Sequence, residues 1–261
     1  MNDKMTKAQA LARFRKLFEQ LSYSQDYSTT FHSFLDFALW RLAPHCAEQM
    51  KDDLNRLNTM YKDAMVPVMC EMFDTWSIAC DNEVSGFYDA LGDLFMECVS
   101  FGRNGQFFTP QPVCDMMAEL NYGDDLADGK TVCDPACGSG RMLLAMAKKN
   151  RRLRFYGSDN DITCVKMAVL NMLINSMKGE IAWMNALTME HYRSYHINLV
   201  LAGTYYLPVL TITGKNETYM IERLSNTMKE LKEAKPYSDE ITTQLKTEEL
   251  IINKKGQISL F

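Results

Sequence analysis

Two aspartates stand at the ends of predicted buried strands, on either side of a glycine-rich loop. Asp134 closes the apolar segment TVCD and is followed by the loop PACGSG, residues 135–140. Its carboxylate repels phosphate and favours a ligand that carries an ammonium group. Asp159 ends the segment RFYGSD and follows Gly140 by 19 residues, a spacing typical of an acid that binds a ribose diol. Together the two acids predict a site for a nucleoside that carries an amino acid.

The same loop fails both common phosphate-binding patterns. Gly138 and Gly140 permit a tight turn and a close approach of the backbone to a ligand, and a helix N-terminus attracts anions. However, no Gly-Lys-Ser/Thr ending follows, and Leu143 occupies the third glycine position of a dinucleotide fingerprint. A phosphate site is therefore not favoured.

The elements that must position these acids alternate between strand and helix from Lys130 onward. We predict strands at TVCD, RFYGSD, EIAWM and INLVLA, with helices over residues 141–149 and 162–177. This alternation predicts an α/β fold with a mostly parallel sheet and right-handed crossovers. From Thr6 to about Ser100 apolar residues recur at helical spacing, which predicts an all-helical N-terminal domain. The predicted division is 1–104 for the helical domain, 105–212 for the α/β core, and 213–261 for a charged helix with a C-terminal hairpin or tail.

Composition excludes some classes of function. The 33 acidic and 28 basic residues give a net charge of −5, so the overall charge does not indicate a nucleic-acid partner. No signal peptide and no membrane-spanning segment is expected. The eight cysteines form no C-x-x-C pair, and we interpret them as reduced core residues of a cytoplasmic protein without a metal site.

Three motifs in a fixed order resemble one family. DPACGSG, residues 134–140, resembles the S-adenosylmethionine (SAM) loop of the N6-adenine DNA methyltransferases, specifically the modification subunits of type I restriction-modification systems. GQFFTPQPV, residues 105–113, is similar to the segment before the family's core, and YDALGDLF, residues 88–95, resembles the helix before that. The resemblance implies a Rossmann-like methyltransferase core, SAM as cofactor, and DNA adenine as substrate.

The resemblance also implies roles for residues on both sides of the core. Phe108, Thr109 and Pro110 would pack near the methionine end of SAM, with Thr109 a hydrogen-bond candidate for its carboxylate. Asp159 would hold the ribose hydroxyls. Asn185 stands where the family usually has an acid that contacts the adenine amino group, and an amide oxygen can supply the same acceptor. A purely structural interpretation of Phe108 as a core residue stays open.

The glycine-rich loop would line the methionine side of the cofactor. By the resemblance, Asp134 and the backbone of Ala136, Gly138 and Gly140 take this role. The alternative is that the two glycines only shape a strand-to-helix turn and that Asp159 is the N-cap of the following helix.

One expected motif is degenerate. In the resembling family the fourth strand ends in Asn-Pro-Pro followed by Tyr or Phe. The Asn accepts hydrogen bonds from the amino group of a flipped-out adenine, and the aromatic ring stacks on that base. Here LVLA is followed by Gly203, Thr204, Tyr205 and Tyr206, so only Tyr206 matches, as the stacking residue. Glycine at the catalytic position has no side chain to orient the amine. We therefore expect adenine methylation by this chain alone to be very weak or absent.

DNA recognition is expected to need a partner. The basic run KKNRRLR, residues 148–154, follows the first helix of the core and is placed by the predicted sheet at the end opposite the SAM loop. We find no segment large enough for a target-recognition domain, in keeping with a family in which a separate specificity subunit reads the sequence.

The terminal segment QISLF resembles the short peptide by which bacterial DNA-processing proteins dock on the sliding clamp. Gln257 would enter one pocket, and Leu260 with Phe261 would enter an apolar one. The alternative is that LIIN and QISLF form an edge hairpin that buries the same side chains.

The preferred hypothesis is a SAM-dependent DNA adenine-N6 methyltransferase-like protein with a degenerate catalytic loop. One alternative is a catalytically silent SAM-binding or scaffold protein that acts through DNA-processing partners. Another is a methyltransferase that acts on a substrate other than DNA.

Overall fold

The computed structural model describes residues 5–220, apart from 62–64, 81–85, 101–107, 124–126 and 216. Residues 1–220 group as one compact unit and residues 221–261 as a second. The predicted charged helix and the terminal segment with Gln257, Leu260 and Phe261 thus lie outside the described residues, and so do the first residues of GQFFTPQPV. The sliding-clamp hypothesis and the domain boundaries stay predictions.

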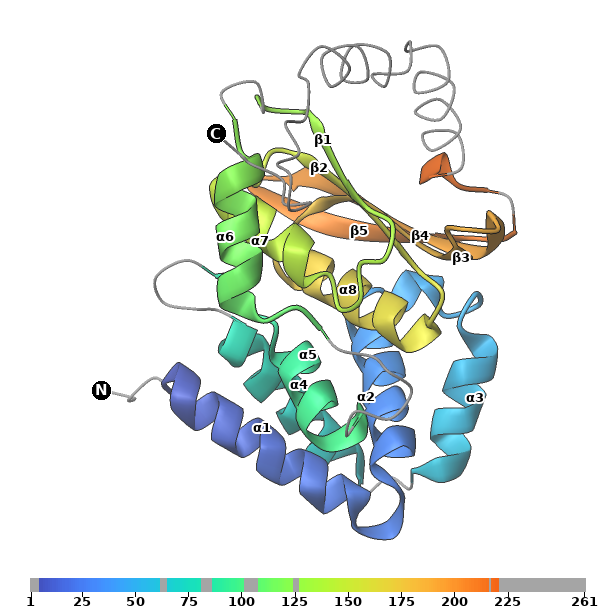
Figure 1. Ribbon diagram of the computed structural model, residues 1–261. Helices are drawn as coiled ribbons and strands as arrows, with labels where there is room; N and C mark the ends of the chain where they lie inside the picture. The colour runs from blue at the N-terminus through green and yellow to red at the C-terminus, as the bar shows by residue number, and fades with distance from the viewer. Residues whose placement is uncertain are drawn as a thin grey trace, which may run out of the picture. The chain divides into compact units, whose positions relative to one another are not determined.

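The N-terminal region is helical, as the apolar spacing predicts. Its first helix begins with a capping box, in which Thr6 and Gln9 each accept from the other's backbone N–H. Asp26 caps the second helix by accepting the N–H of Thr29. The α-helices are α1 (Lys7–Leu21), α2 (Tyr27–Leu42), α3 (Lys51–Met60), α4 (Val66–Cys80) and α5 (Ala90–Leu94) (Figure 1). Two short 3-10 helices, η1 (Ser22–Ser24) and η2 (Pro44–Cys46), and a π-helix, η4 (Phe95–Ser100), lie between or after them.

A five-stranded sheet with helices follows. Its strands lie in the order β1-β2-β3-β4-β5, and the first three run parallel. The elements are α6 (Gln111–Asn121), β1 (Thr131–Asp134), α7 (Arg141–Lys149), β2 (Arg154–Asp159), α8 (Ile162–Ile174), β3 (Lys178–Asn185), β4 (Glu190–Ala202) and β5 (Tyr205–Thr213). A helical region followed by an α/β sheet is therefore confirmed.

The sheet is mixed rather than mostly parallel, so this detail of the prediction is wrong. β4 runs antiparallel to β3, and β5 runs antiparallel to β4. Only residues 186–189 separate β3 from β4. A parallel crossover needs a dozen or more residues, so this short connection permits only a hairpin. The apolar run at Leu199–Leu201 is also not buried, because Val200 and Leu201 are 52% and 60% exposed.

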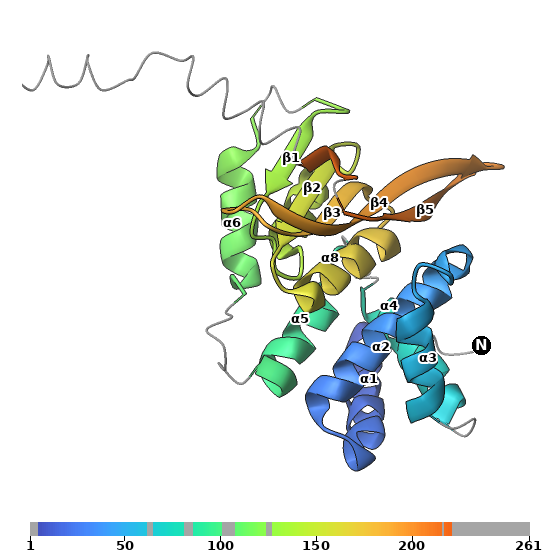
Figure 2. The ribbon, with the colours of Figure 1, turned by 90° about the vertical axis from the view of Figure 1, so that its right-hand side faces the viewer.

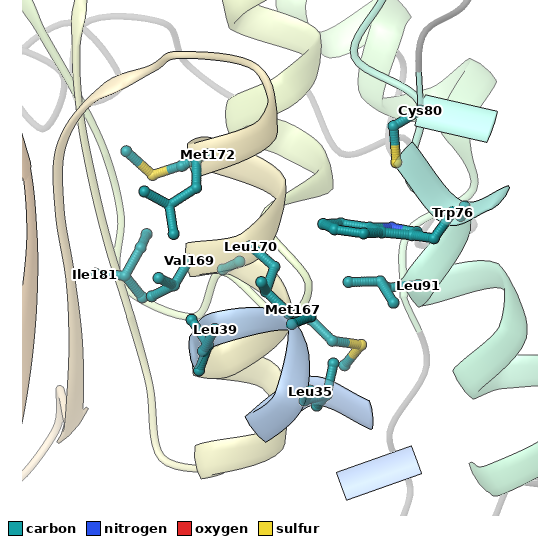
Figure 3. Packing of buried hydrophobic residues seen from close by; sticks show 14 of the residues in the cluster. Leu35, Leu39, Trp76, Cys80, Leu91, Met167, Val169, Leu170, Met172 and Ile181 are labelled. Carbon is teal, nitrogen blue, oxygen red and sulfur yellow. The ribbon is translucent and has the colours of Figure 1, made fainter. Parts of the chain in front are cut away.

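The hydrophobic core is centred on α8, which lies between the sheet and α2 in both views (Figures 1 and 2). Met167 and Leu170 of α8 are fully buried, as are Leu35 of α2 and Trp76 of α4. Figure 3 shows these side chains together with Ile181 of β3. Full burial of each aliphatic side chain contributes roughly 1.5–3 kcal/mol, so α8 is a main source of the stability of this unit.

A group of buried charges crosses the same contact between α2 and α8. Lys166 of α8 pairs with the carboxylate of Asp36 of α2, which is fully buried, and lies 3.4 Å from Asp53. Arg56 pairs with Asp36 from its other side. Two cations thus compensate a carboxylate that burial would otherwise destabilise.

Several classes of feature are not found among the residues that the structure describes. No helix there has the length and apolar character needed to cross a membrane. No group of His, Cys, Asp and Glu side chains there suits a metal ion. The eight cysteines are free thiols, and five of them are buried.

Candidate functional site

The carboxyl ends of β1 and β2 bring the two sequence-predicted aspartates to one edge of the sheet. Asp134 pairs in register with Gly157, two residues before Asp159. Asp134 accepts the N–H of Ala136 at 3.1 Å, and Asp159 accepts the N–H of Gly138 at 2.9 Å. Both carboxylates therefore hold the backbone of the loop that separates their strands.

Asp159 is not the N-cap of α8, which removes one structural interpretation. The cap is Asp161, whose carboxylate accepts the N–H of Thr163 at 2.7 Å. Asp159 instead accepts the N–H of Asp161 and that of Gly138, both at 2.9 Å. Its position depends on the loop as well as on the helix.

Both aspartates are partly desolvated. Burial raises the pKa of Asp134, and the nearby charge of Asp159 raises it further, while the hydrogen bond from Ala136 opposes the shift. Burial likewise raises the pKa of Asp159, against the hydrogen bonds from Asp161 and Gly138. Carboxylates in this state gain more from a cationic or hydroxyl-bearing ligand than fully solvated ones do.

Both loop glycines occupy the left-handed region of backbone conformation. Gly138 has φ +53°, and a Cβ there would lie 3.0 Å from the ring of Phe108. Gly140 has φ +82°, and its Cβ would lie 3.2 Å from Cβ of Ala168. The first glycine lets Phe108 close over the loop, and the second lets α7 start against α8.

A pocket of about 250 Å³ opens at this edge. Five of the predicted site residues line it: Phe108, Thr109, Asp134, Ala136 and Gly138. Pro110 and Gly140 are not among the lining residues. Pro110 is the N-cap of α6, and Gly140 is the N-cap of α7. The volume is slightly below the roughly 300–1,000 Å³ of typical ligand sites, which suits one part of a SAM-sized molecule.

Asn185 lies at the same edge of the sheet, at the end of β3. Asp159 pairs in register with Trp183, two residues before Asn185. The side-chain oxygen of Asn185 accepts the N–H groups of Leu187 at 2.9 Å and Thr188 at 3.2 Å. The amide thus shapes the turn into β4, and it does not line the pocket at the glycine-rich loop.

A buried polar network centred on Asp89, which the sequence analysis did not predict, holds the glycine-rich loop in place. Asp89 is 1% exposed and accepts from Oγ of Ser139 at 2.5 Å, Nε of Arg141 at 3.0 Å and Nδ2 of Asn171 at 2.8 Å. Asn171 also donates to the carbonyl of Ser139 at 2.9 Å. One carboxylate therefore ties the start of α5 to the loop and to α8. An arginine directly after Gly-Ser-Gly, with two acids in YDALGDLF, was the available signal.

Arg141 extends this network to the wall of the pocket. Its Nη2 lies 2.7 Å from Asp93, and its Nη1 lies 3.5 Å from the carbonyl of Thr109. Burial acts to lower the pKa of Arg141, but the carboxylates of Asp89 and Asp93 together outweigh it and raise the pKa, so the guanidinium is charged. Phe108 is fixed separately by stacking on Phe95 at 5.5 Å.

Gly203 and Tyr206 lie away from this site. Because β4 is antiparallel to β3, Gly179 at the start of β3 faces Ile197, and the rest of β4 runs past that end. The turn that contains Gly203 is therefore at the edge of the sheet opposite Asp134. The expectation that the fourth strand brings residues 203–206 beside the loop does not agree with this topology. Tyr206 is 62% exposed there.

Comparison with known proteins assigns the chain to a family. The family model described as N-6 DNA Methylase matches residues 88–234, more than half of the chain. The chain belongs to this family. The match includes the Asp89 network, the pocket and the whole sheet.

Proteins similar to this chain include methylase subunits of type I restriction enzymes. The MpnII methylase subunit of Mycoplasma pneumoniae is 29% identical over 125 residues, which are 42% of this chain and 23% of that protein. The MjaVIII methylase subunit of Methanocaldococcus jannaschii is 28% identical over 148 residues, 50% of this chain and 25% of that protein. The chain thus spans about a quarter of the length of these relatives.

A solved structure is also similar. It is the methyltransferase subunit of a type I restriction-modification system from Streptococcus thermophilus, with 22% identity and a TM-score of 0.30. The similarity covers 42% of this chain and 25% of that one.

Proposed function

We propose that this N-6 DNA methylase family protein binds SAM at the carboxyl ends of β1 and β2. The observation that carries the proposal is the pocket itself. It combines a desolvated Asp134 with a loop backbone that Asp159 and Phe108 hold from two sides. An acid beside a pocket and a second acid one strand away suit an ammonium group and a ribose diol.

The residues present fit the two ends of the cofactor. Asp134 would accept from the ammonium group, and Asp159 would accept from the ribose hydroxyls. Phe108 would shield the methionine end from water, with Thr109 and Pro110 beside it. When bound, SAM supplies a methyl group on a positively charged sulfur. The backbone around Ala136, Gly138 and Gly140 would allow the ligand a close approach because no side chain intervenes at the two glycines.

Transfer to adenine N6 by this chain alone is proposed to be very weak or absent. A flipped-out base needs polar acceptors and a stacking surface near the methyl donor. Gly203 offers no side chain, and its turn lies at the opposite edge of the sheet from Asp134. Loss of such positioning groups is worth several kcal/mol of barrier.

DNA and a separate specificity subunit are the proposed partners. The relatives support this, since they are methylase subunits of type I restriction enzymes. The alternative, a SAM-binding protein that acts only through its partners, shares the pocket and differs in turnover.

Calorimetric titration with SAM and S-adenosylhomocysteine tests the binding proposal. We expect micromolar dissociation constants, and a loss of about tenfold or more in Asp159→Ala, because charge-assisted hydrogen bonds contribute roughly 1.5–3 kcal/mol. Asp128→Ala is the matched control, since Asp128 is an exposed aspartate paired with Arg152. No binding of either ligand by the folded wild-type protein would overturn the proposal.

Methyl transfer separates the two functional hypotheses. Purified chain, tritiated SAM and adenine-containing DNA should give no label above background, and the same assay is repeated with an added specificity subunit from a type I system. Label in DNA adenine from the chain alone would contradict the proposed inactivity. Label that requires the subunit would favour the enzyme over the silent SAM-binding protein.

A further inference from the structure

Arg141 occupies an unusual position for an arginine whose charge is already compensated. Its side chain is 9% exposed and is one of the side chains that line the pocket. Nε and Nη2 face the carboxylates of Asp89 and Asp93 at 2.7–3.0 Å. Nη1 has a single long contact among the described residues, 3.5 Å to the carbonyl of Thr109.

This arrangement fixes the guanidinium in one orientation. A guanidinium is a planar fork with five N–H donors, and two carboxylates here bind one side of the fork. The N–H groups of Nη1 therefore keep hydrogen-bonding capacity beside Thr109, which also lines the pocket. They need little further ordering when a ligand arrives, which favours a strong interaction.

The pocket wall then presents both an acceptor and a donor to a ligand. Asp134 supplies a carboxylate, and Arg141 supplies donors from a cation. An amino acid in its zwitterionic form has the complementary pair, an ammonium group and a carboxylate. A nucleoside without the amino acid lacks both.

We propose that Arg141 binds the α-carboxylate of the amino-acid moiety, so that the site selects nucleosides that carry an intact amino acid. This inference rests on the proposed SAM site. It assigns the carboxylate to Arg141 through Nη1, beside Thr109. Asp89 and Asp93 act as positioning residues that aim the guanidinium.

A pair of ligands that differ only in the carboxylate provides the test. S-Adenosylhomocysteine and its decarboxylated analogue share the nucleoside, the sulfur and the ammonium group. We expect the wild-type protein to prefer S-adenosylhomocysteine at least about tenfold in calorimetric titration, as a charge-assisted hydrogen bond predicts. An equal affinity for the two ligands would overturn the inference.

Variants then locate the preference. Arg141→Lys keeps the charge and loses the fork, so the preference should fall to about threefold or less while the affinity for the decarboxylated analogue changes less than twofold. Arg141→Met combined with Asp89→Asn removes the buried pair as a unit and avoids an uncompensated charge if the single change impairs folding. Lys148→Met is the matched control, since Lys148 lies on the same helix and pairs with Asp115.

The outcomes distinguish this inference from the proposed function. If the wild-type protein binds neither ligand, the SAM site and the inference fail together. If it binds both with a strong preference that the folded Arg141 variants retain, the SAM site stands and the role of Arg141 is wrong. A preference lost in both variants and kept in the control supports it.

Discussion

At the residue scale, the two aspartates of the loop cost the unliganded protein stability. Burial raises the pKa of both Asp134 and Asp159, which means that the fold disfavours their charged forms. The same desolvation strengthens their interaction with a bound cation or hydroxyl. The two carboxylates that lower the stability of the unliganded protein are thus the ones expected to bind a ligand most strongly, a trade-off that is common at functional sites.

Asp134→Asn is therefore expected to stabilise the unliganded protein at neutral pH. The amide still accepts the N–H of Ala136 but carries no charge. We expect a gain of about 1 kcal/mol, roughly 2–4 °C in Tm for a chain of this size. Because the folded-state pKa of Asp134 is raised, its penalty is complete above that pKa and disappears as the pH falls below the unfolded value.

Thermal unfolding of Asp134→Asn and wild type across pH 3–8 checks whether the substitution stabilises the protein at neutral pH. The gain should vanish near pH 3, where both states are protonated. Asp128→Asn is the control of opposite sign, because the hydrogen bond from Arg152 lowers the pKa of Asp128. A variant that is less stable than wild type at pH 7, or a gain that persists at pH 3, would contradict the account of Asp134.

Gly138→Ala separates backbone strain from the contact with Phe108. Alanine in the left-handed region costs roughly 1–2 kcal/mol, and at Gly138 its Cβ would also press on Phe108 at 3.0 Å. Gly129→Ala has the same strain, at φ +81°, with nothing within 4 Å. We expect similar losses in Tm from strain, but a loss of SAM affinity of about tenfold or more only in Gly138→Ala. Equal affinities in calorimetry would show that Phe108 does not matter to the site.

At the element scale, β1, its loop and α7 supply most of the pocket wall, and the β4–β5 hairpin contributes nothing to it. The pocket is lined by residues between Asp134 and Met142, which belong to β1, the loop and α7, and by residues between Phe108 and Met117. The hairpin turns at the far edge, where Tyr205 is 75% exposed. A substitution in the hairpin should therefore leave the pocket unchanged.

Restoring the family's motif tests this separation. Replacing residues 203–206 by Asn-Pro-Pro-Tyr should not create adenine methylation, because the new side chains would stand at the wrong edge of the sheet. SAM affinity should stay within about twofold of wild type. Transfer of labelled methyl groups to DNA measures adenine methylation, and calorimetric titration measures the SAM affinity. Activity gained by the repaired chain would mean that β4 can lie beside β1.

The same elements show what the sequence could predict. The bounds of β1, α7 and β2 follow from local signals, an apolar run closed by an aspartate and a helix opened by glycine. The direction of β4 depends on its pairing partner, and an apolar run alone does not specify that. The four-residue turn at 186–189 was the overlooked signal. The role of Asp89 escaped prediction because its partners, Ser139 and Asn171, lie 50 and 82 positions away.

At the scale of the whole molecule, the helical region and the α/β region share one core. The family match begins at residue 88, so α2 lies outside it. Nevertheless Leu35 of α2 packs against Met167 and Leu170 of α8 (Figure 3). The charge of Lys166 meets Asp36 across the same contact. The α/β region therefore depends on helices that the family match does not include.

Asp36→Ala measures that dependence. It leaves Lys166 buried with only the more distant Asp53 at 3.4 Å, and breaking a buried pair from one side costs roughly 3–5 kcal/mol. We expect a fall in Tm of about 6 °C or more, observed by circular dichroism. In calorimetry below the melting temperature, SAM affinity should change less than threefold, because Asp36 does not line the pocket.

Asp36→Leu combined with Lys166→Met is the matched rescue. Removing both charges and filling their space with apolar side chains is often neutral or stabilising, so the double variant should melt near or above the wild type. Arg56 is 48% exposed and can turn to solvent once Asp36 is gone, so it imposes no comparable penalty. A double variant as unstable as Asp36→Ala would mean that the charges themselves specify how α2 packs on α8. The pair would then hold the two regions together by its geometry, and apolar packing alone would not suffice.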